Sequence, residues 1–346
     1  MQCRDSTRGV RPVAVSVDTD LAEGESSREP AWSSLNAFAI RAGILIIAVL
    51  LFGIFALTDH TFASTANLTN VLEQITVVGI IAIGETAVML TGGIDLSVGS
   101  VVLLSSVVMC DLSVNHGWPV AAAIVVGVGS GLVVGLVNGL VSVLFGIEPI
   151  IVTLGTLLAA GGLGEVLLNN TWITVTSPAF VDVAVLKPVG IPLMVWVMVG
   201  LYALAAVLMY RSSFGRGIYA IGGNRAALRL AGLAVGRRII AVYALSGLLA
   251  GVAGYLEAGQ LGIISQNNGS GMNFSAILAV LIGGLSATTG GIGRVEKTLV
   301  GAIVAGMIAN YLILKGVPGA YEQAAVGALI LVAVLADYAL RRGEAR

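Results

Sequence analysis

The sequence predicts an all-α polytopic membrane protein with about ten transmembrane helices. Hydrophobic residues make up 57% of the 346-residue chain and charged residues only 11%, whereas soluble domains carry about 25% charged residues. The apolar residues gather in runs of about 20, the length that crosses ~30 Å of hydrocarbon. The 46 glycines show no Gly-X-Y period, and within apolar runs they favour closely packed membrane helices. A soluble globular enzyme is therefore excluded, and a net charge of −1 gives no reason to expect nucleic-acid binding.

The apolar runs divide the chain into a polar tail and a membrane domain. The composition predicts that residues 1–38 form a disordered N-terminal tail. It predicts that residues 39–342 form the membrane domain and that residues 343–346 form a C-terminal tail. The predicted spans lie near 39–58, 70–91, 95–112, 118–143, 149–170, 190–210, 238–258, 273–289, 296–315 and 320–340. The glycine-rich segment 273–289 either spans the membrane or re-enters it.

The basic residues orient these spans. Lys and Arg concentrate on the cytoplasmic side of membrane proteins. With the N-terminus inside and ten alternating spans, 16 of the 18 basic residues fall inside, and only Lys187 and Lys315 fall outside. We therefore expect both termini, and the loop 211–237, to be cytoplasmic.

Two groups of residues are candidates for the lining of a pathway. The segment from Thr91 to Ser100 interrupts two apolar runs, and irregular backbone at membrane depth is tolerated where it faces protein or water. This segment contributes Gly92, Gly93, Ile94, Asp95 and Ser97, of which Asp95 is placed to cap the next helix. The carboxylates of Glu85 and Glu165 lie deep in predicted spans, where each either lines a pathway or makes a structural hydrogen bond.

The loop 211–237 predicts a short helix. Asn224 suits the N-cap, and Gly232 suits the position just past the C-terminus. Arg225 and Arg229 are expected on one face, and Ala227 and Leu230 on another. A helix this short does not hold alone in water, so we expect it to dock on its own bundle or on a partner. The spacing of four between Gly127, Gly131, Gly135 and Gly139 predicts a separate helix face for close packing.

No nucleotide or catalytic motif is evident in the sequence. The stretch from Gly283 to Arg294 is glycine-rich, but Lys297-Thr298 follows Glu296 rather than the glycine that a phosphate loop requires. We therefore expect the chain to bind no cofactor and to be no enzyme.

Four segments, in order, resemble the permease subunit of ribose/xylose-type ABC sugar importers, within the branched binding-protein-dependent permease family. They are Leu90 to Ser100, Ile151 to Thr156, Gly215 to Gly232, and Leu281 to Arg294. The resemblance implies a fold similar to vitamin B12-type importer permeases. It also implies a multi-pass protein of the bacterial inner membrane and a second permease copy, identical or a close paralogue. Its other implied partners are a tandem-domain ATPase that binds ATP and an extracytoplasmic sugar-binding protein.

The resemblance also assigns roles to residues. It implies an ATPase-coupling helix in the 211–237 loop and a cytoplasmic gate at Gly92 to Asp95, with Ile147 and Glu148 as its neighbours. The coupling residues are Gly223, Asn224, Arg225, Ala226, Ala227, Leu228, Arg229, Leu230 and Gly232. Family members often carry an acidic residue where this chain has Arg225, which predicts different charge pairing at the ATPase contact. An Arg often found in the fifth span is replaced by Gly161, which makes ribose itself doubtful as the solute.

Two other classes of function stay open at this stage. An ion-coupled secondary transporter of a small polar solute would also be polytopic, but no row of acids spaced like a proton relay is present. A membrane-embedded enzyme would have to rely on Glu85 or Glu165 alone.

Overall fold

The computed structural model describes residues 31–286 and 289–344, and these residues are almost entirely helical. The chain forms two units, residues 1–41 and residues 42–346. The first unit contains the beginning of α1 (Ala31–Thr58), so helix starts eight residues before the predicted first span. The predicted tail is otherwise outside the described residues, as are residues 345–346.

The second unit contains the rest of α1 and all the other elements. They are α2 (Thr65–Leu90), α3 (Val98–Cys110) with the π-helical turn η1 (Asp111–Asn115), α4 (Val120–Phe145), α5 (Pro149–Leu168), β1 (Ile173–Thr174), α6 (Pro178–Val185), the 3-10 turn η2 (Pro188–Gly190), α7 (Leu193–Arg211), α8 (Ser213–Gly223), α9 (Arg225–Leu230), α10 (Val235–Leu261), β2 (Ile263–Ile264), α11 (Met272–Ile282), α12 (Val295–Leu314) and α13 (Gly319–Glu344). The two strands pair antiparallel, with Ile173 opposite Ile264.

Eight of these helical segments are long and apolar enough to cross a membrane, as the composition predicts. The apolar part of α1 from Gly43 to Thr58 and the 11-residue α11 are shorter. At 1.5 Å per residue α11 is roughly 16 Å long, about half of the hydrocarbon thickness. The chain is thus a polytopic helical membrane protein, and the total of ten spans stays a prediction.

Local sequence explains where several helices begin and end. The Ser64 side chain accepts a hydrogen bond from the backbone N–H of Asn67 at the start of α2, and the Ser212 side chain caps α8 in the same way. Gly146 ends α4 in the left-handed conformation, and Pro149 opens α5 without a hydrogen-bond donor to lose. These devices satisfy helix-end groups that the bilayer would leave unpaired.

The predicted glycine stripe on α4 packs against neighbouring helices, which confirms the expectation of close packing. A Cβ added at Gly131 would lie 2.4 Å from the Gly247 carbonyl oxygen on α10, and one at Gly135 would lie 2.2 Å from the Tyr243 oxygen. A Cβ at Gly127 would instead meet Met109 of α3 at 2.6 Å. Only glycine permits backbones to approach this closely, so α4 and α10 are fixed against one another.

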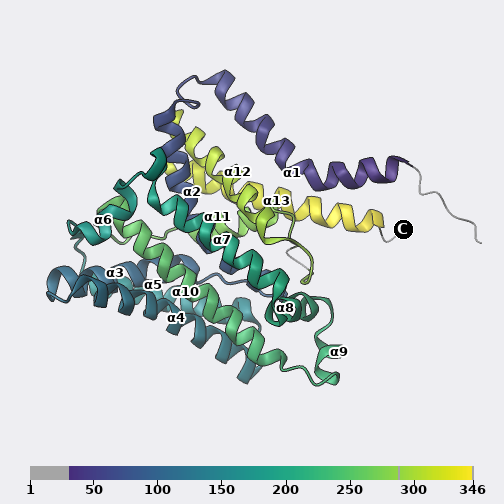
Figure 1. Cartoon of the computed structure of the whole chain (residues 1–346). Helices are drawn as coiled ribbons and strands as arrows, with labels where there is room; N and C mark the ends of the chain where they lie inside the picture. Colours follow the sequence, from purple (N-terminus) through teal and green to yellow (C-terminus); the bar gives the residue numbers. More distant parts are fainter. Residues whose placement is uncertain (1–30, 287–288, 345–346) are drawn as a thin grey trace, which may run out of the picture. The chain divides into compact units, whose positions relative to one another are not determined.

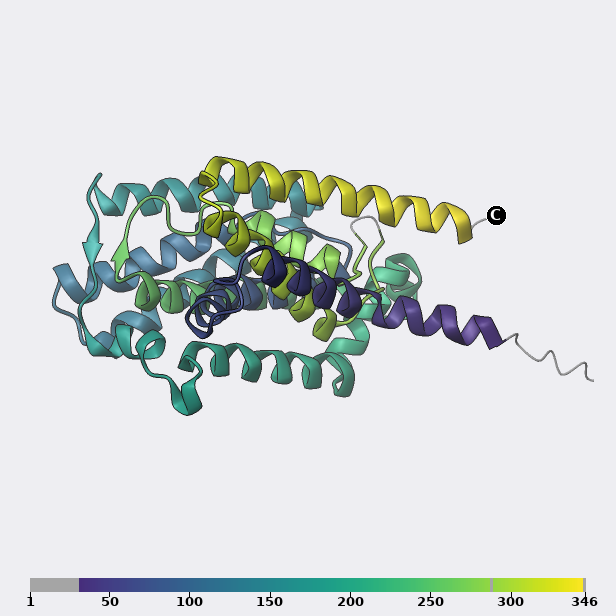
Figure 2. The ribbon, with the colours of Figure 1, turned by 90° about the horizontal axis from the view of Figure 1, so that it is seen from above.

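The elements of residues 42–346 pack around α10 and α2, both of which are mostly buried. Figure 1 shows α8 and α9 together at one end of the bundle. Figure 2, turned by 90°, shows α7 along one side of this unit and α13 along the other, with further helices between them. No residue of α13 from Gly319 to Tyr338 is fully buried, and only 17% of the most apolar stretch of α5 is. These two helices therefore leave broad apolar faces for lipid or for another chain.

Candidate functional site

All four segments that carry the family resemblance meet at one end of the bundle. The end of α2 receives a hydrogen bond from the loop before α12, since the Gly291 N–H donates to the Leu90 carbonyl oxygen at 2.8 Å. Gly222, near the end of α8, lies against both Leu90 and Gly291. The Thr153 hydroxyl of α5 donates to the Ile94 carbonyl at 3.2 Å. We call the contact of residues 90–92, 222–223 and 290–292 the junction.

Glycines make the junction possible. A Cβ added at Gly222 would lie 2.0 Å from the Gly291 nitrogen and 2.2 Å from the Leu90 oxygen, both backbone atoms that cannot rotate away. One added at Gly290 would lie 2.7 Å from the Gly222 Cα. Gly92 has φ +79°, which favours glycine. Three distant parts of the chain are thus in direct backbone contact.

Asp95 anchors a buried polar cluster beside the junction. Its Oδ1 accepts hydrogen bonds from the Ser97 N–H at 3.0 Å and the Ser97 hydroxyl at 2.6 Å. Its Oδ2 accepts from the Ser246 hydroxyl of α10 at 2.9 Å, and Asn138 of α4 donates to the Ser97 oxygen at 2.9 Å. The helix begins at Val98 with Ser97 at its N-cap, two residues later than the predicted cap, because Asp95 binds the Ser97 N–H and draws residues 95–97 into a turn.

Glu85 belongs to the same interior. Its side chain is fully buried, and its Oε1 accepts a hydrogen bond from the Asp95 N–H at 3.3 Å. Among the described residues no group donates to its Oε2. Two roles are predicted for Glu85, a structural hydrogen bond and the lining of a pathway. The structure shows the hydrogen bond, and the role in a pathway stays a prediction.

The helix predicted in the 211–237 loop is α9, with the predicted ends. The Asn224 Oδ1 accepts from the Ala227 N–H at 2.9 Å, and Gly232 follows the helix with φ +77°. The observed faces of α9 differ from the expected ones, however. Arg225 and Leu228, one turn apart, are the half-buried pair, whereas Arg229 is exposed and Leu230 is 91% exposed. The sequence does not show where the helix bundle lies relative to α9. In the structure the face that carries Arg225 and Leu228 contacts the bundle.

The other coupling residues continue this exposed surface. Gly223, Asn224, Ala226, Ala227 and Gly232 are all exposed.

The α4–α5 loop lies beside α9, a contact that the resemblance does not imply. Ile147 and Glu148 line a cavity of about 140 Å³ together with Arg225 and Arg229. The gate candidates of the α4–α5 loop and two arginines of the predicted coupling helix therefore share one small cavity. Ile94 is half-buried, and Gly93 is buried with a Cβ position 2.4 Å from the Tyr243 hydroxyl.

Glu165 lies apart from the other candidates. It is exposed on α5, 12 residues after Thr153, or roughly 18 Å along the helix. It lines a different cavity of about 260 Å³ with Gly161, Gln266 and Asn268. The sequence therefore singled out residues of two sites rather than one.

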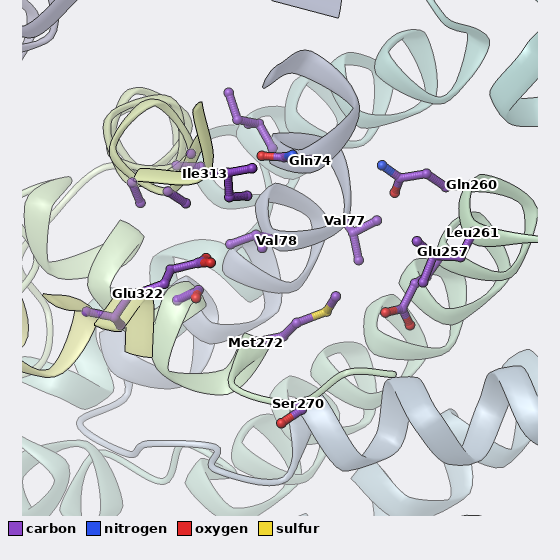
Figure 3. Close-up of a pocket in the computed structure, with 17 residues that line it drawn as sticks. Gln74, Val77, Val78, Glu257, Gln260, Leu261, Ser270, Met272, Ile313 and Glu322 are labelled. Atoms are coloured by element: carbon purple, nitrogen blue, oxygen red, sulfur yellow. The ribbon is translucent and has the colours of Figure 1, made fainter. Parts of the chain in front are cut away.

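A further cavity, with a mostly apolar lining and several polar side chains, lies beside the middle of α2 and was not predicted. It has a volume of about 280 Å³ between α2, α10, α11, α12 and α13. Figure 3 shows polar side chains around it, with Gln74, Glu257, Gln260 and Glu322 contributed by three of these helices. We call it the Gln74–Glu322 cavity. Glu257 is only 3% exposed, and its Oε1 accepts a hydrogen bond from the Gly269 N–H at 3.2 Å.

Sequence reasoning missed Ser246, Asn138 and this cavity. The available signal was a polar residue inside an apolar span, since such side chains face protein or a cavity rather than lipid. Glu257 lies at the end of the predicted span 238–258, and its side chain is nevertheless buried.

No group of three or more metal-ligating His, Cys, Asp or Glu side chains occurs in the part of the chain that the structure describes. The features that the described residues do show are helix packing, a backbone junction and polar cavities within a membrane bundle. They define a multi-pass membrane transport protein.

Comparison with known proteins names the family. Residues 67–334 match the family model described as "Branched-chain amino acid transport system / permease component". The chain belongs to this family, and it is a permease component of a transport system. The predicted resemblance to a permease family is thereby confirmed.

Several characterised relatives align over most of this chain. The Ribose import permease protein of Escherichia coli (strain K12) is 37% identical over 87% of this chain and 95% of its own length. The Fructose import permease protein of Rhizobium meliloti is 30% identical over 94% and 93%, and the L-arabinose ABC transporter permease protein of Azospirillum brasilense is 31% identical over 98% and 98%. No solved structure gives a significant match, so the likeness to vitamin B12-type permeases stays a prediction.

Proposed function

We propose that the chain is the permease subunit of an ABC importer that moves a monosaccharide or a sugar-like solute across the bacterial inner membrane. The relatives that align over nearly its whole length carry names for ribose, fructose and arabinose import. The transported solute is therefore assigned to this chemical class, and not to a single sugar.

Energy for transport comes from a separate tandem-domain ATPase that binds ATP in its own domains. The exposed face of α9 is the observation that supports a contact with a separate ATPase. Leu230 is 91% exposed at the end of a capped helix that would not be stable in water on its own. Burying this leucine against an apolar surface of a partner protein would be favourable, because it removes apolar area from water.

The remaining partners and the orientation complete the proposal. With both termini and α9 in the cytoplasm, the ATPase binds at the junction end, and an extracytoplasmic sugar-binding protein delivers the solute at the other end. A second permease copy, identical or a close paralogue, covers part of the exposed apolar surface and completes the pathway.

The test changes the exposed leucine. Leu230→Asp in the reconstituted transporter should abolish co-purification of the ATPase, because a carboxylate would be desolvated in an apolar pocket. Hydrolysis stimulated by the loaded binding protein should fall with it. Unchanged co-purification and stimulation would reject α9 as the ATPase contact. Sugar uptake by the purified chain without any ATPase would favour an ion-coupled transporter instead.

A further inference from the structure

The α9 helix is held to the rest of the chain by few contacts. It has six residues, of which only Arg225 and Leu228 are half-buried. Leu228 packs against the hydrophobic core. Because a helix of this length has little stability of its own, these contacts decide where it lies.

The Arg225 contact reaches the end of α2. Its Nη2 donates a hydrogen bond to the carbonyl oxygen of Thr91, the residue that caps α2, although the two residues are 134 positions apart. The carbonyls in the last turn of a helix lack partners within the helix and carry partial negative charge. A guanidinium is therefore well matched to this acceptor, and a charge-assisted bond is stronger than a neutral one.

The turn after Thr91 is joined to three further helices. The Ile94 carbonyl accepts from Thr153 of α5, and the Asp95 carboxylate accepts from Ser246 of α10 and from Ser97 at the start of α3. A displacement of this turn therefore acts on α3, α5 and α10 through hydrogen bonds rather than through lipid.

We propose that Arg225 is a positioning residue that transmits movement of α9 to the Thr91–Asp95 turn. The proposal rests on the function proposed above for α9 and adds the path by which that movement enters the membrane helices. The acidic residue that the family often has at this position could not make the bond when ionised, since a carboxylate has no proton to donate. The link is thus a property of this chain's own arginine.

The experiment separates coupling from assembly. Arg225→Gln, Arg225→Lys and the control Arg237→Gln, which changes an exposed arginine of α10, are reconstituted with the ATPase and the binding protein. We measure ATPase co-purification, stimulated hydrolysis, and sugar imported per ATP. The structure has Arg225 half-buried with its guanidinium bonded to Thr91, and not at the exposed face of α9 that would meet the ATPase. R225Q should therefore keep co-purification and lose about tenfold in sugar imported per ATP, as expected for loss of one charge-assisted hydrogen bond. R225K should recover most of this loss, because its ammonium group can donate to the same carbonyl.

Two results would overturn the proposal. R225Q with the same sugar imported per ATP as R237Q would show that the link carries no movement. Loss of ATPase co-purification in R225Q would make Arg225 a contact residue for the ATPase instead. Failure of the proposed function is recognised separately, because L230D would then leave co-purification and stimulation intact.

A measurement on the unchanged protein does not depend on the folding of any variant. When ATP binds to the complex, hydrogen exchange should change in the 90–95 turn together with α9. A change in α9 with none in the 90–95 turn would contradict the proposal.

Discussion

The junction lies at the end of α2, the Gln74–Glu322 cavity lies beside its middle, and the two regions differ in how tightly they are packed. At the junction, backbone meets backbone, and a single added Cβ at Gly222 would come within 2.2 Å of two other segments. At the cavity, five helices leave about 280 Å³ open, with two carboxylates and two amides around it. None of the ion pairs among the described residues involves Glu257 or Glu322.

The difference indicates that the two regions of the bundle have different roles. A tightly packed contact transmits a displacement, because neighbouring backbones cannot move independently. A mostly apolar cavity with a few polar side chains offers a small solute both apolar contact and hydrogen-bond partners. The substitutions below test this contrast, in order of decreasing effect.

The largest effect is expected from Gly222→Val. The new side chain would overlap the backbones of Leu90 and Gly291, and backbone overlap is not relieved by a change of rotamer. We expect little folded protein, as measured by size-exclusion chromatography and thermal unfolding, and no uptake in a transport assay. Gly200→Ala on α7 is the matched control, because a Cβ there has nothing within 4 Å. Equal stability of the two variants would show that the junction is not tightly packed.

A smaller loss is expected from Asp95→Leu. This change leaves the Ser97 N–H and the hydroxyls of Ser97 and Ser246 without their acceptor. Each buried donor left unpaired costs about 1–3 kcal/mol, so the midpoint of thermal unfolding should fall by several degrees. Asp95→Asn keeps one oxygen acceptor and should lose less. A larger loss in Asp95→Asn than in Asp95→Leu would contradict this account.

At the cavity we expect the opposite sign from Glu257→Gln. The amide oxygen can still accept from the Gly269 N–H, and the ionisable group in the membrane interior is removed. The midpoint of thermal unfolding should therefore stay constant or rise, while uptake changes if the solute touches this wall. A fall in the unfolding midpoint comparable to that of Asp95→Leu would show that the cavity is as constrained as the junction.

The smallest effect is expected outside the bundle, at Asp59. Hydrogen bonds from Thr61 and from Lys315, whose Nζ lies 2.9 Å from the Asp59 Oδ2, lower the pKa of this half-buried carboxyl to about 2. Because the folded pKa is lower than the ordinary value of 3.8, the contribution is complete above that value and is lost as the pH falls through about 2. The stability difference between wild type and Asp59→Asn should shrink over this interval, as followed by tryptophan fluorescence. A difference independent of pH would exclude the ion pair as its cause.

Much of the fold follows from periodicity and length. The apolar runs predicted α2, α4, α5, α7, α10, α12 and α13 close to their observed positions, because a helix must satisfy its backbone hydrogen bonds within lipid. The stripe from Gly127 to Gly139 predicted close packing, and the identity of the packed helices, α10 and α3, became evident only in the structure.

The candidate sites were predictable in part. Asn224 and Gly232 marked the ends of α9, because capping depends on residues within a few positions of each other. The face of α9 that meets the body was not predictable, since it depends on Thr91, which is distant in sequence. Glu257 illustrates the same limit, because its partner Gly269 and the cavity that it lines with residues of α11 to α13 come from parts of the chain that follow it.

By itself, the sequence determined that this protein lies in a membrane, where most of its long apolar helices lie, and to which family it belongs. Those properties depend on local composition and on short motifs. Tertiary structure alone decided that residues 90, 222 and 291 touch, that Arg225 reaches Thr91, and that polar side chains from three helices surround one cavity. The reason is that each of these contacts joins residues that no local pattern relates, and only the packed bundle brings them together.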